Sequence, residues 1–338
     1  SMLLFAMLFL TGYDLSLDEI KNFRQWGSKT PGHPEHGVTP GVETTTGPLG
    51  QGIMNAVGMA MAEAHLASVF NRPGFDIVDH YTYVICSDGD FMEGASHEAA
   101  SLAGHFGLGK LICVYDDNHI SIEGDTALTY SDDVARRFEA YHWHVQNLGE
   151  KANDCPALEA ALRSARQEKD RPSLIIVRSH IGYGSPHRQD TREAHGEPLG
   201  EEEVRLTKQF YGWPENEHFL VPDQARSHML KAVQHGEQLE GEWNTLVAAY
   251  REAYADEARQ FDAALRGDLP AGWDDALPRF HPDDGPLATR AASEKVLNFF
   301  AERIPWLVGG SGDLAPSTRT LLKGSPYFAR GQYQGRNI

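Results

Sequence analysis

The sequence is short of positive charge. Its 30 Lys and Arg residues face 48 Asp and Glu residues, so the formal net charge over 338 residues is −18 at pH 7. Proteins that bind duplex nucleic acid need clustered Lys and Arg to release counterions from the phosphate backbone. We therefore expect no nucleic-acid partner. Any phosphate that the chain binds must be held by local groups against an unfavourable overall field.

Cysteines and long apolar runs are also scarce. The three cysteines, Cys86, Cys113 and Cys155, have no paired or metal-type spacing. Each lies in or beside an apolar segment, as free core cysteines do, which favours a reducing, cytosolic compartment. The apolar run Met2–Leu10 is too short to cross a bilayer and no basic residue precedes it. It is expected to be a buried helix, and no membrane partner is expected.

The residues that are present predict an α/β fold. Hydrophobic residues make up 41% of the chain, enough for a large core. From Tyr81 to Val177, β-rich runs alternate with helical ones, which is typical of a parallel sheet covered by helices. The expected strands are Tyr81–Cys86, Leu111–Tyr115, Trp143–Gln146 and Leu174–Val177. A crossover helix, with Asp154 as its possible N-cap, lies between the last two.

The flanking segments suggest further parts. A glycine-rich loop after Thr44 leads into a long buried helix that ends at Phe70. Beyond Tyr211 the sequence is charged and contains one or two long helices within 225–265. From Ala288 an α/β pattern resumes, with a helix and then a short strand at Trp306–Val308. We interpret 1–214 as a diphosphate- and metal-binding domain, 215–285 as a connector, and 286–338 as the beginning of a second α/β domain.

Polar residues gather after two neighbouring predicted strands. Ser87-Asp88-Gly89-Asp90 follows the first and Asp116-Asp117-Asn118 the second, so Asp88 and Asn118 are thirty positions apart. The carboxyl ends of adjacent parallel strands meet at the ligand crevice of an open sheet. Carboxylate, amide and carbonyl oxygens suit Mg²⁺ or Ca²⁺, and Gly89 would let a phosphate approach the backbone.

Each piece also has an ordinary explanation. An Asp-Gly after a strand is usually a turn, and an Asp-Asp-Asn run is usually a solvated loop. It is the spacing of the two pieces, together with their position at strand ends, that favours a shared site.

This pattern is similar to the thiamine diphosphate fingerprint, and the surrounding sequence resembles the transketolase family along the whole chain. The segments that carry the resemblance are 30–35 (TPGHPE), 43–52 (ETTTGPLGQG), 92–98 (MEGASHE), 115–122 (YDDNHISI), 181–185 (IGYGS) and 310–317 (GSGDLAPS). The family fold has helices on both faces of the sheet. A divalent ion, Mg²⁺ or Ca²⁺, would be held by Asp88, Asn118 and the backbone carbonyl of Ile120.

The resemblance also implies roles around thiamine diphosphate. Gly89 would lie on the diphosphate, with Asn118 beside it, and Ile122 would support the bent cofactor. The segment Gly47, Pro48 and Leu49 would lie against the aminopyrimidine, and Asp313 would approach the cofactor from the partner domain.

Substrate and subunit contacts are implied in the same way. His33 and His195 would face the sugar and the reacting carbon, where an imidazole can pass protons near neutral pH. Arg290 and Ser317 would bind the substrate phosphate. Glu93 and Glu98 would belong to the interface of a homodimer. Without the resemblance, such residues would ordinarily be read as surface charges, helix caps or a surface histidine.

The implied function is transketolase activity, a reversible transfer of a two-carbon ketol group from a ketose phosphate to an aldose phosphate in the pentose phosphate pathway. Sequence at both ends resembles internal family sequence, which implies that flanking segments with further cofactor-binding residues are missing. Two alternatives stay open. One is an inactive cofactor-binding or dimerisation fragment. The other is a related thiamine diphosphate enzyme, such as a phosphoketolase or a deoxyxylulose phosphate synthase. Ser87 departs from the family, which usually has Gly there, and a positive φ at this position would strain it.

Overall fold

The computed structural model describes all 338 residues, which form two compact units. The first contains residues 1–60 and 80–240, and the second contains 61–79 and 241–338. The three breaks between the units, after residues 60, 79 and 240, do not coincide with the predicted domain boundaries after residues 214 and 285. The functional division predicted from the sequence stays a prediction.

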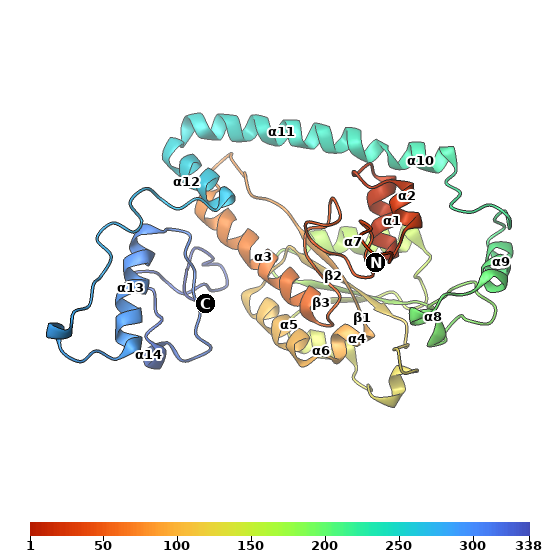
Figure 1. Cartoon of the computed structure of the whole chain (residues 1–338), viewed down its shortest axis with the longest axis horizontal. Coiled ribbons are helices and arrows are strands. Elements are labelled where there is room, and N and C mark those ends of the chain that lie inside the picture. The colour runs from red at the N-terminus through yellow and green to blue at the C-terminus, as the bar shows by residue number, and fades with distance from the viewer. The chain divides into compact units, whose positions relative to one another are not determined.

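The first unit is built on a four-stranded parallel sheet (Figure 1). Its strands are β1 (Thr82–Ser87), β2 (Leu111–Asp117), β3 (His144–Asn147) and β4 (Ser173–Arg178), in the order β1-β2-β4-β3. Ser87 pairs with Asp116, so the carboxyl ends of β1 and β2 lie side by side. The predicted α/β class and all four predicted strands of this sheet are confirmed, with ends shifted by one or two residues.

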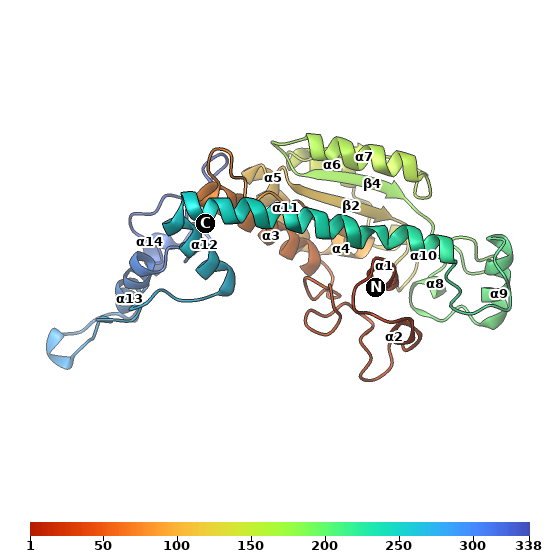
Figure 2. The ribbon, with the colours of Figure 1, turned by 90° about the horizontal axis from the view of Figure 1, so that it is seen from above.

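Helices cover both faces of the sheet because alternate side chains of each strand point to opposite sides. Helix α7 (Cys155–Gln167) packs through Ala161 and Ala165 against Ile112 and Ile175. Its predicted N-cap is confirmed, since Ala157 donates its N–H to the Asp154 carboxylate at 3.0 Å. Figure 2 shows α7 on one side of the sheet and α4 on the other.

Aromatic side chains fill the second face. Phe91 of α4 (Asp88–Met92) lies 4.9 Å, centroid to centroid, from both Tyr115 of β2 and Phe138 of α6 (Val134–Ala140). The Trp143 indole donates to the carbonyl of Ala100 in α5 (Gly94–Phe106) at 2.8 Å. This packing holds α4 against the sheet, next to the carboxyl end of β1.

Three helices precede the sheet: α1 (Met2–Leu10), α2 (Leu17–Lys21) and α3 (Gln51–Phe70). The two predicted apolar helices form, but each is buried on one side only. In α1, Phe5 and Leu8 are buried and the remaining apolar side chains are wholly or partly exposed. Helix α3 is long and apolar enough to cross a membrane, but this is weak evidence because core helices of many proteins have the same length and composition.

The remaining helices follow the sheet. They are α8 (Glu193–Gly196), α9 (Glu201–Phe210), α10 (Asp223–Met229), α11 (Lys231–Ala253), α12 (Ala255–Arg266), α13 (Thr289–Arg303) and α14 (Ala315–Thr318), with 3₁₀ turns at Thr126–Leu128 and Pro282–Asp284. In the second unit, Phe70, Val247, Tyr250 and Phe261 form a buried cluster.

Three sequence expectations are corrected. Residues 306–308 form no strand, because only Gly309 finds a backbone partner, at Asn337. Cys155 is exposed at the start of α7, whereas Cys86 and Cys113 are buried as expected. Ser87 has a φ of −127°, an extended conformation that any residue adopts, so the expected strain is absent.

Candidate functional site

Asp88 is the centre of the candidate site. It is the first residue of α4, directly after β1, and only 2% of it is exposed. One carboxylate oxygen, Oδ2, accepts the backbone N–H groups of Asn118 at 3.2 Å and His119 at 3.1 Å. The other, Oδ1, accepts the hydroxyl of Tyr115 at 2.7 Å. The predicted meeting of residues 88 and 118 therefore occurs, and both lie at the ends of neighbouring strands.

The surroundings of Asp88 are anionic. Burial raises the pKa of its carboxyl and the nearby Asp117 raises it further, while the hydroxyl and the two N–H donors lower it. No Lys or Arg is among the groups that shift this pKa. A cavity of about 230 Å³ adjoins the carboxylate, and Asp117, Asp132 and Asp133 also line it. A buried carboxylate without a basic partner fits a site for a cation.

Asn118 and Ile120 offer the other predicted metal ligands. The Asn118 amide oxygen accepts the Ile120 N–H at 2.9 Å, and Asn118 itself is buried. That oxygen keeps a second lone pair, so the hydrogen bond and a cation are compatible. No group of three or more His, Cys, Asp or Glu side chains is arranged to hold a metal. The predicted set, with one carboxylate, an amide and a carbonyl, suits a hard ion that takes its other ligands from phosphate or water.

Gly89 follows Asp88 and lies close to the side chain of Leu49. A Cβ at this position would lie 3.3 Å from both terminal carbons of Leu49. Gly47 adopts a φ of +137°, and a Cβ there would lie 2.6 Å from the Cγ of His33. Gly89 is thus a neighbour of Leu49, and Gly47 is a neighbour of His33. The predicted contacts of these residues with the aminopyrimidine and the diphosphate stay predictions.

Asp90 ties these pieces together. Its carboxylate accepts the N–H of Gly50 at 2.9 Å through Oδ1 and that of Ser87 at 3.0 Å through Oδ2. A Cβ on Gly50 would lie 3.0 Å from the Cβ of Glu93, the N-cap residue of α5. The loop that precedes α3 and the turn that follows β1 are therefore in contact, and Glu93 lies beside them. Pro48 and Leu49 of this loop are exposed.

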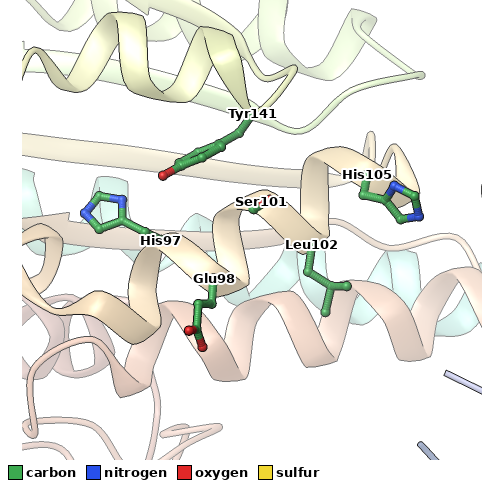
Figure 3. A pocket seen from close by; sticks show the side chains of 6 residues that line it. All are labelled: His97, Glu98, Ser101, Leu102, His105 and Tyr141. Atoms are coloured by element: carbon green, nitrogen blue, oxygen red, sulfur yellow. The ribbon is translucent and has the colours of Figure 1, made fainter. Parts of the chain in front are cut away.

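Glu98 lies one turn further along α5, beside a second cavity of about 600 Å³. Figure 3 shows this cavity, with His97, Glu98 and Leu102 on α5 and Tyr141 reaching over from the end of α6. The Nε2 of His97 is 2.7 Å from the carbonyl oxygen of Phe91, and burial lowers the pKa of this imidazole. Glu98 is exposed, and its place in a subunit interface stays a prediction.

The other predicted site residues make no direct contact with Asp88. His195 is exposed near the end of the short helix α8, and Ile122 is 74% exposed in the loop after β2. In the second unit, Arg290 donates to the carbonyl of Ser317 at 3.3 Å, so these two predicted phosphate ligands do lie together. Asp313, in the same unit, adopts a positive φ of 65°.

Sequence reasoning missed two residues that shape the site, Tyr115 and Asp90. Tyr115 ends a predicted strand and begins a segment that resembles the family, but neither pattern gives its side chain a role, although a buried tyrosine hydroxyl generally requires a polar partner. Asp90 is one of the polar residues after the first predicted strand, with no role of its own. Its position three residues after Ser87 is that of a capping-box side chain, which was a usable signal.

Comparison with known proteins agrees with this picture. The family model described as "Transketolase, thiamine diphosphate binding domain" matches residues 1–270. The transketolase of Halalkalibacterium halodurans is 52% identical over 338 residues, which are 100% of this chain and 50% of that protein. The transketolase of Bacillus subtilis is 52% identical over 339 residues, with the same shares of 100% and 50%.

Solved structures are similar over the same extent. The transketolase from Leishmania mexicana has a TM-score of 0.96 and 45% identity, and the match covers 99% of this chain and 50% of that one. The transketolase of Pichia stipitis in complex with sedoheptulose 7-phosphate has a TM-score of 0.96 and 43% identity, with the same coverage of 99% and 50%. The chain spans about half the length of the relatives it matches.

Proposed function

The chain belongs to the transketolase family, and from that premise we propose that it supplies the diphosphate- and metal-binding part of a transketolase. The reaction would be the reversible transfer of a two-carbon ketol group from a ketose phosphate to an aldose phosphate. Sugar phosphates would be the substrates. This activity would belong to a whole enzyme, since the relatives that the chain matches are about twice as long as this chain.

One observation carries the proposal. The buried Asp88 carboxylate at the end of β1 contacts the backbone of Asn118 at the end of β2, and no basic side chain neutralises it. Leaving a buried carboxylate without a counter-charge is costly. A divalent cation would supply the missing charge, and Gly89, which has no side chain, would let phosphate oxygens approach its backbone N–H.

The residues would then have distinct tasks. Asp88, Asn118 and the carbonyl of Ile120 would hold Mg²⁺ or Ca²⁺, while the backbone of Gly89 would receive the diphosphate. Thiamine diphosphate, when bound, supplies the carbanion stabilisation that breaking a ketose carbon–carbon bond requires. The loop containing Leu49 would orient the cofactor.

Side chains further out would handle the substrate. His33 and His195 would carry protons to and from sugar hydroxyls, and Arg290 with Ser317 would bind the substrate phosphate through a forked guanidinium and a hydroxyl. Glu93 and Glu98 would lie between subunits of a homodimer. With its cysteines free, the protein would work in the cytosol.

Cofactor titration tests the proposal directly. The full-length natural protein should bind thiamine diphosphate in the presence of Mg²⁺ or Ca²⁺ and lose most of that affinity in EDTA. Asp88→Asn should weaken metal-dependent binding by at least about tenfold, because the ion loses its only charged protein ligand. Asp125→Asn is the matched control, since asparagine also caps the turn that Asp125 begins.

The outcomes are separable. Failure of the wild-type protein to bind the cofactor with either metal would refute the proposed function. Equal binding by Asp88→Asn and wild type would remove Asp88 from the metal site. A coupled assay with xylulose 5-phosphate and ribose 5-phosphate then distinguishes transketolase from a phosphoketolase, which would instead release an acyl phosphate.

A further inference from the structure

The hydroxyl of Tyr115 is the only side-chain donor to Asp88. Tyr115 belongs to β2 and is 3% exposed, and its hydroxyl donates to Oδ1 of Asp88 at 2.7 Å. The opposite oxygen, Oδ2, receives the two backbone N–H groups of Asn118 and His119. Three donors, one to Oδ1 and two to Oδ2, thus fix the orientation of the Asp88 carboxylate.

The two backbone donors come from consecutive residues of the loop after β2, and the N–H groups of Asn118 and His119 both point to Oδ2 of Asp88. His119 has a φ of +64°, and its imidazole Nε2 lies 3.1 Å from Oδ1 of Asp117. These contacts hold the loop after β2 in a defined orientation beside Asp88.

The Tyr115 ring is also held in place. Phe91, from the same short helix as Asp88, packs edge-on against it with a centroid distance of 4.9 Å and an interplanar angle of 62°. The hydroxyl has a second, longer contact of 3.3 Å with Oδ1 of Asp117. Both hydrogen-bond contacts of the Tyr115 hydroxyl are thus with carboxylate oxygens, so the hydroxyl is the donor in them.

The hydroxyl of Tyr115 donates its hydrogen bond to Oδ1 of Asp88. Such a donor favours the ionised carboxylate, which is the form that binds a cation.

We infer that Tyr115 is a positioning residue that orients the Asp88 carboxylate for the divalent cation. The inference rests on the proposed function, since it assumes that the cation binds there. Groups that orient a metal ligand typically contribute about 10- to 100-fold to metal affinity. If the tyrosine served only to fill the core, loss of its hydroxyl would change stability without changing metal affinity.

The test compares Tyr115→Phe with wild type in the full-length natural protein. Mg²⁺ is titrated at saturating thiamine diphosphate, the quenching of intrinsic fluorescence is followed, and the titration is repeated with Ca²⁺. Thermal unfolding of the metal-free protein is measured on the same samples. We expect the apparent Kd for both ions to rise about 10- to 100-fold.

Tyr130→Phe is the matched control. It lines the same cavity, and its buried hydroxyl makes no hydrogen bond to Asp88. We expect its metal affinity to stay within about twofold of wild type, because it donates nothing to Asp88. If Tyr115→Phe has a lower unfolding temperature than wild type, its metal affinity is measured below that temperature. The measured affinity then still tests the positioning role of Tyr115.

Each result has one meaning. If wild type binds the cofactor with metal but Tyr115→Phe matches Tyr130→Phe in metal affinity, the positioning role is overturned and the proposed function stands. If wild type shows no metal-dependent cofactor binding, the proposed function itself fails.

Discussion

The backbone N–H of Gly50 lies 2.9 Å from Oδ1 of Asp90, forty positions along the chain. The second oxygen of the same carboxylate accepts the N–H of Ser87 at 3.0 Å. One side chain therefore joins the loop before α3 to the turn after β1. The residues that would contact the aminopyrimidine and the residue that would hold the metal are adjacent because of this bridge.

Asp90→Asn should loosen the bridge. The amide keeps one acceptor oxygen and places an NH₂ group against the second backbone N–H, so that donor loses its partner. We expect a loss of about 1–3 kcal/mol in the free energy of unfolding, measured in urea. The Gly50 amide should also exchange faster with deuterium. Asp154→Asn is the control, since Asp154 caps a helix and asparagine caps equally well. Equal behaviour of the two variants would contradict the bridging role.

Gly89→Ala should separate cofactor binding from stability. Gly89 lies in helix α4, where alanine is favoured over glycine by up to about 1 kcal/mol. The new methyl would press at 3.3 Å only on the flexible end of Leu49. We expect an unchanged or higher unfolding temperature together with at least about tenfold weaker thiamine diphosphate binding.

Gly94→Ala provides the comparison for that experiment. Gly94 begins α5, and a Cβ there would meet no atom within 4 Å. It should bind the cofactor as wild type does. Unimpaired binding by Gly89→Ala would show that the diphosphate does not approach residue 89.

Gly47→Ala should be costly for two reasons. Its φ of +137° lies in a region that only glycine enters readily, and the added Cβ would lie 2.6 Å from Cγ of His33. Gly37 also has a positive φ, of +82°, but a Cβ there would meet nothing within 4 Å. In urea unfolding, Gly47→Ala should therefore lose about 1–3 kcal/mol more than Gly37→Ala. Similar losses would mean that His33 moves aside freely.

His180 should make stability depend on pH. Its Nδ1 lies 2.8 Å from an oxygen of Asp190 and its Nε2 lies 2.9 Å from an oxygen of Glu150. The hydrogen bond with Asp190 and then that with Glu150 raise the pKa of the imidazole, while burial and the charge of Arg178 lower it by less. Because the folded pKa exceeds the unfolded value of about 6.5, this stabilisation is complete below the unfolded pKa. It is lost as pH rises through the folded pKa.

The measurement is the unfolding temperature of wild type and His180→Gln across pH 5 to 9. The difference between them should be largest at the acid end and should shrink toward the alkaline end. A difference that is independent of pH would mean that His180 is not charged in the folded protein.

Local patterns in the sequence were sufficient for much of this fold. Alternating strand and helix signals located β1, β2, β3 and β4, and a cap signal located α7, because these elements depend on side-chain periodicity and local hydrogen bonds. The strand expected at 306–308 did not form, since a strand also needs a partner along its length, and local sequence does not supply one.

By itself the sequence determined the family, the parallel α/β sheet, and the expectation that Asp88 and Asn118 meet, because thirty residues make one strand-helix-strand unit. Only the tertiary structure decided that Asp88 receives a hydroxyl from Tyr115 and two amides from the next loop, and that Asp90 joins Gly50 to Ser87. These contacts depend on strand register, which places the carboxyl ends of β1 and β2 side by side. Such features arise when distant segments pack together, so no local pattern encodes them.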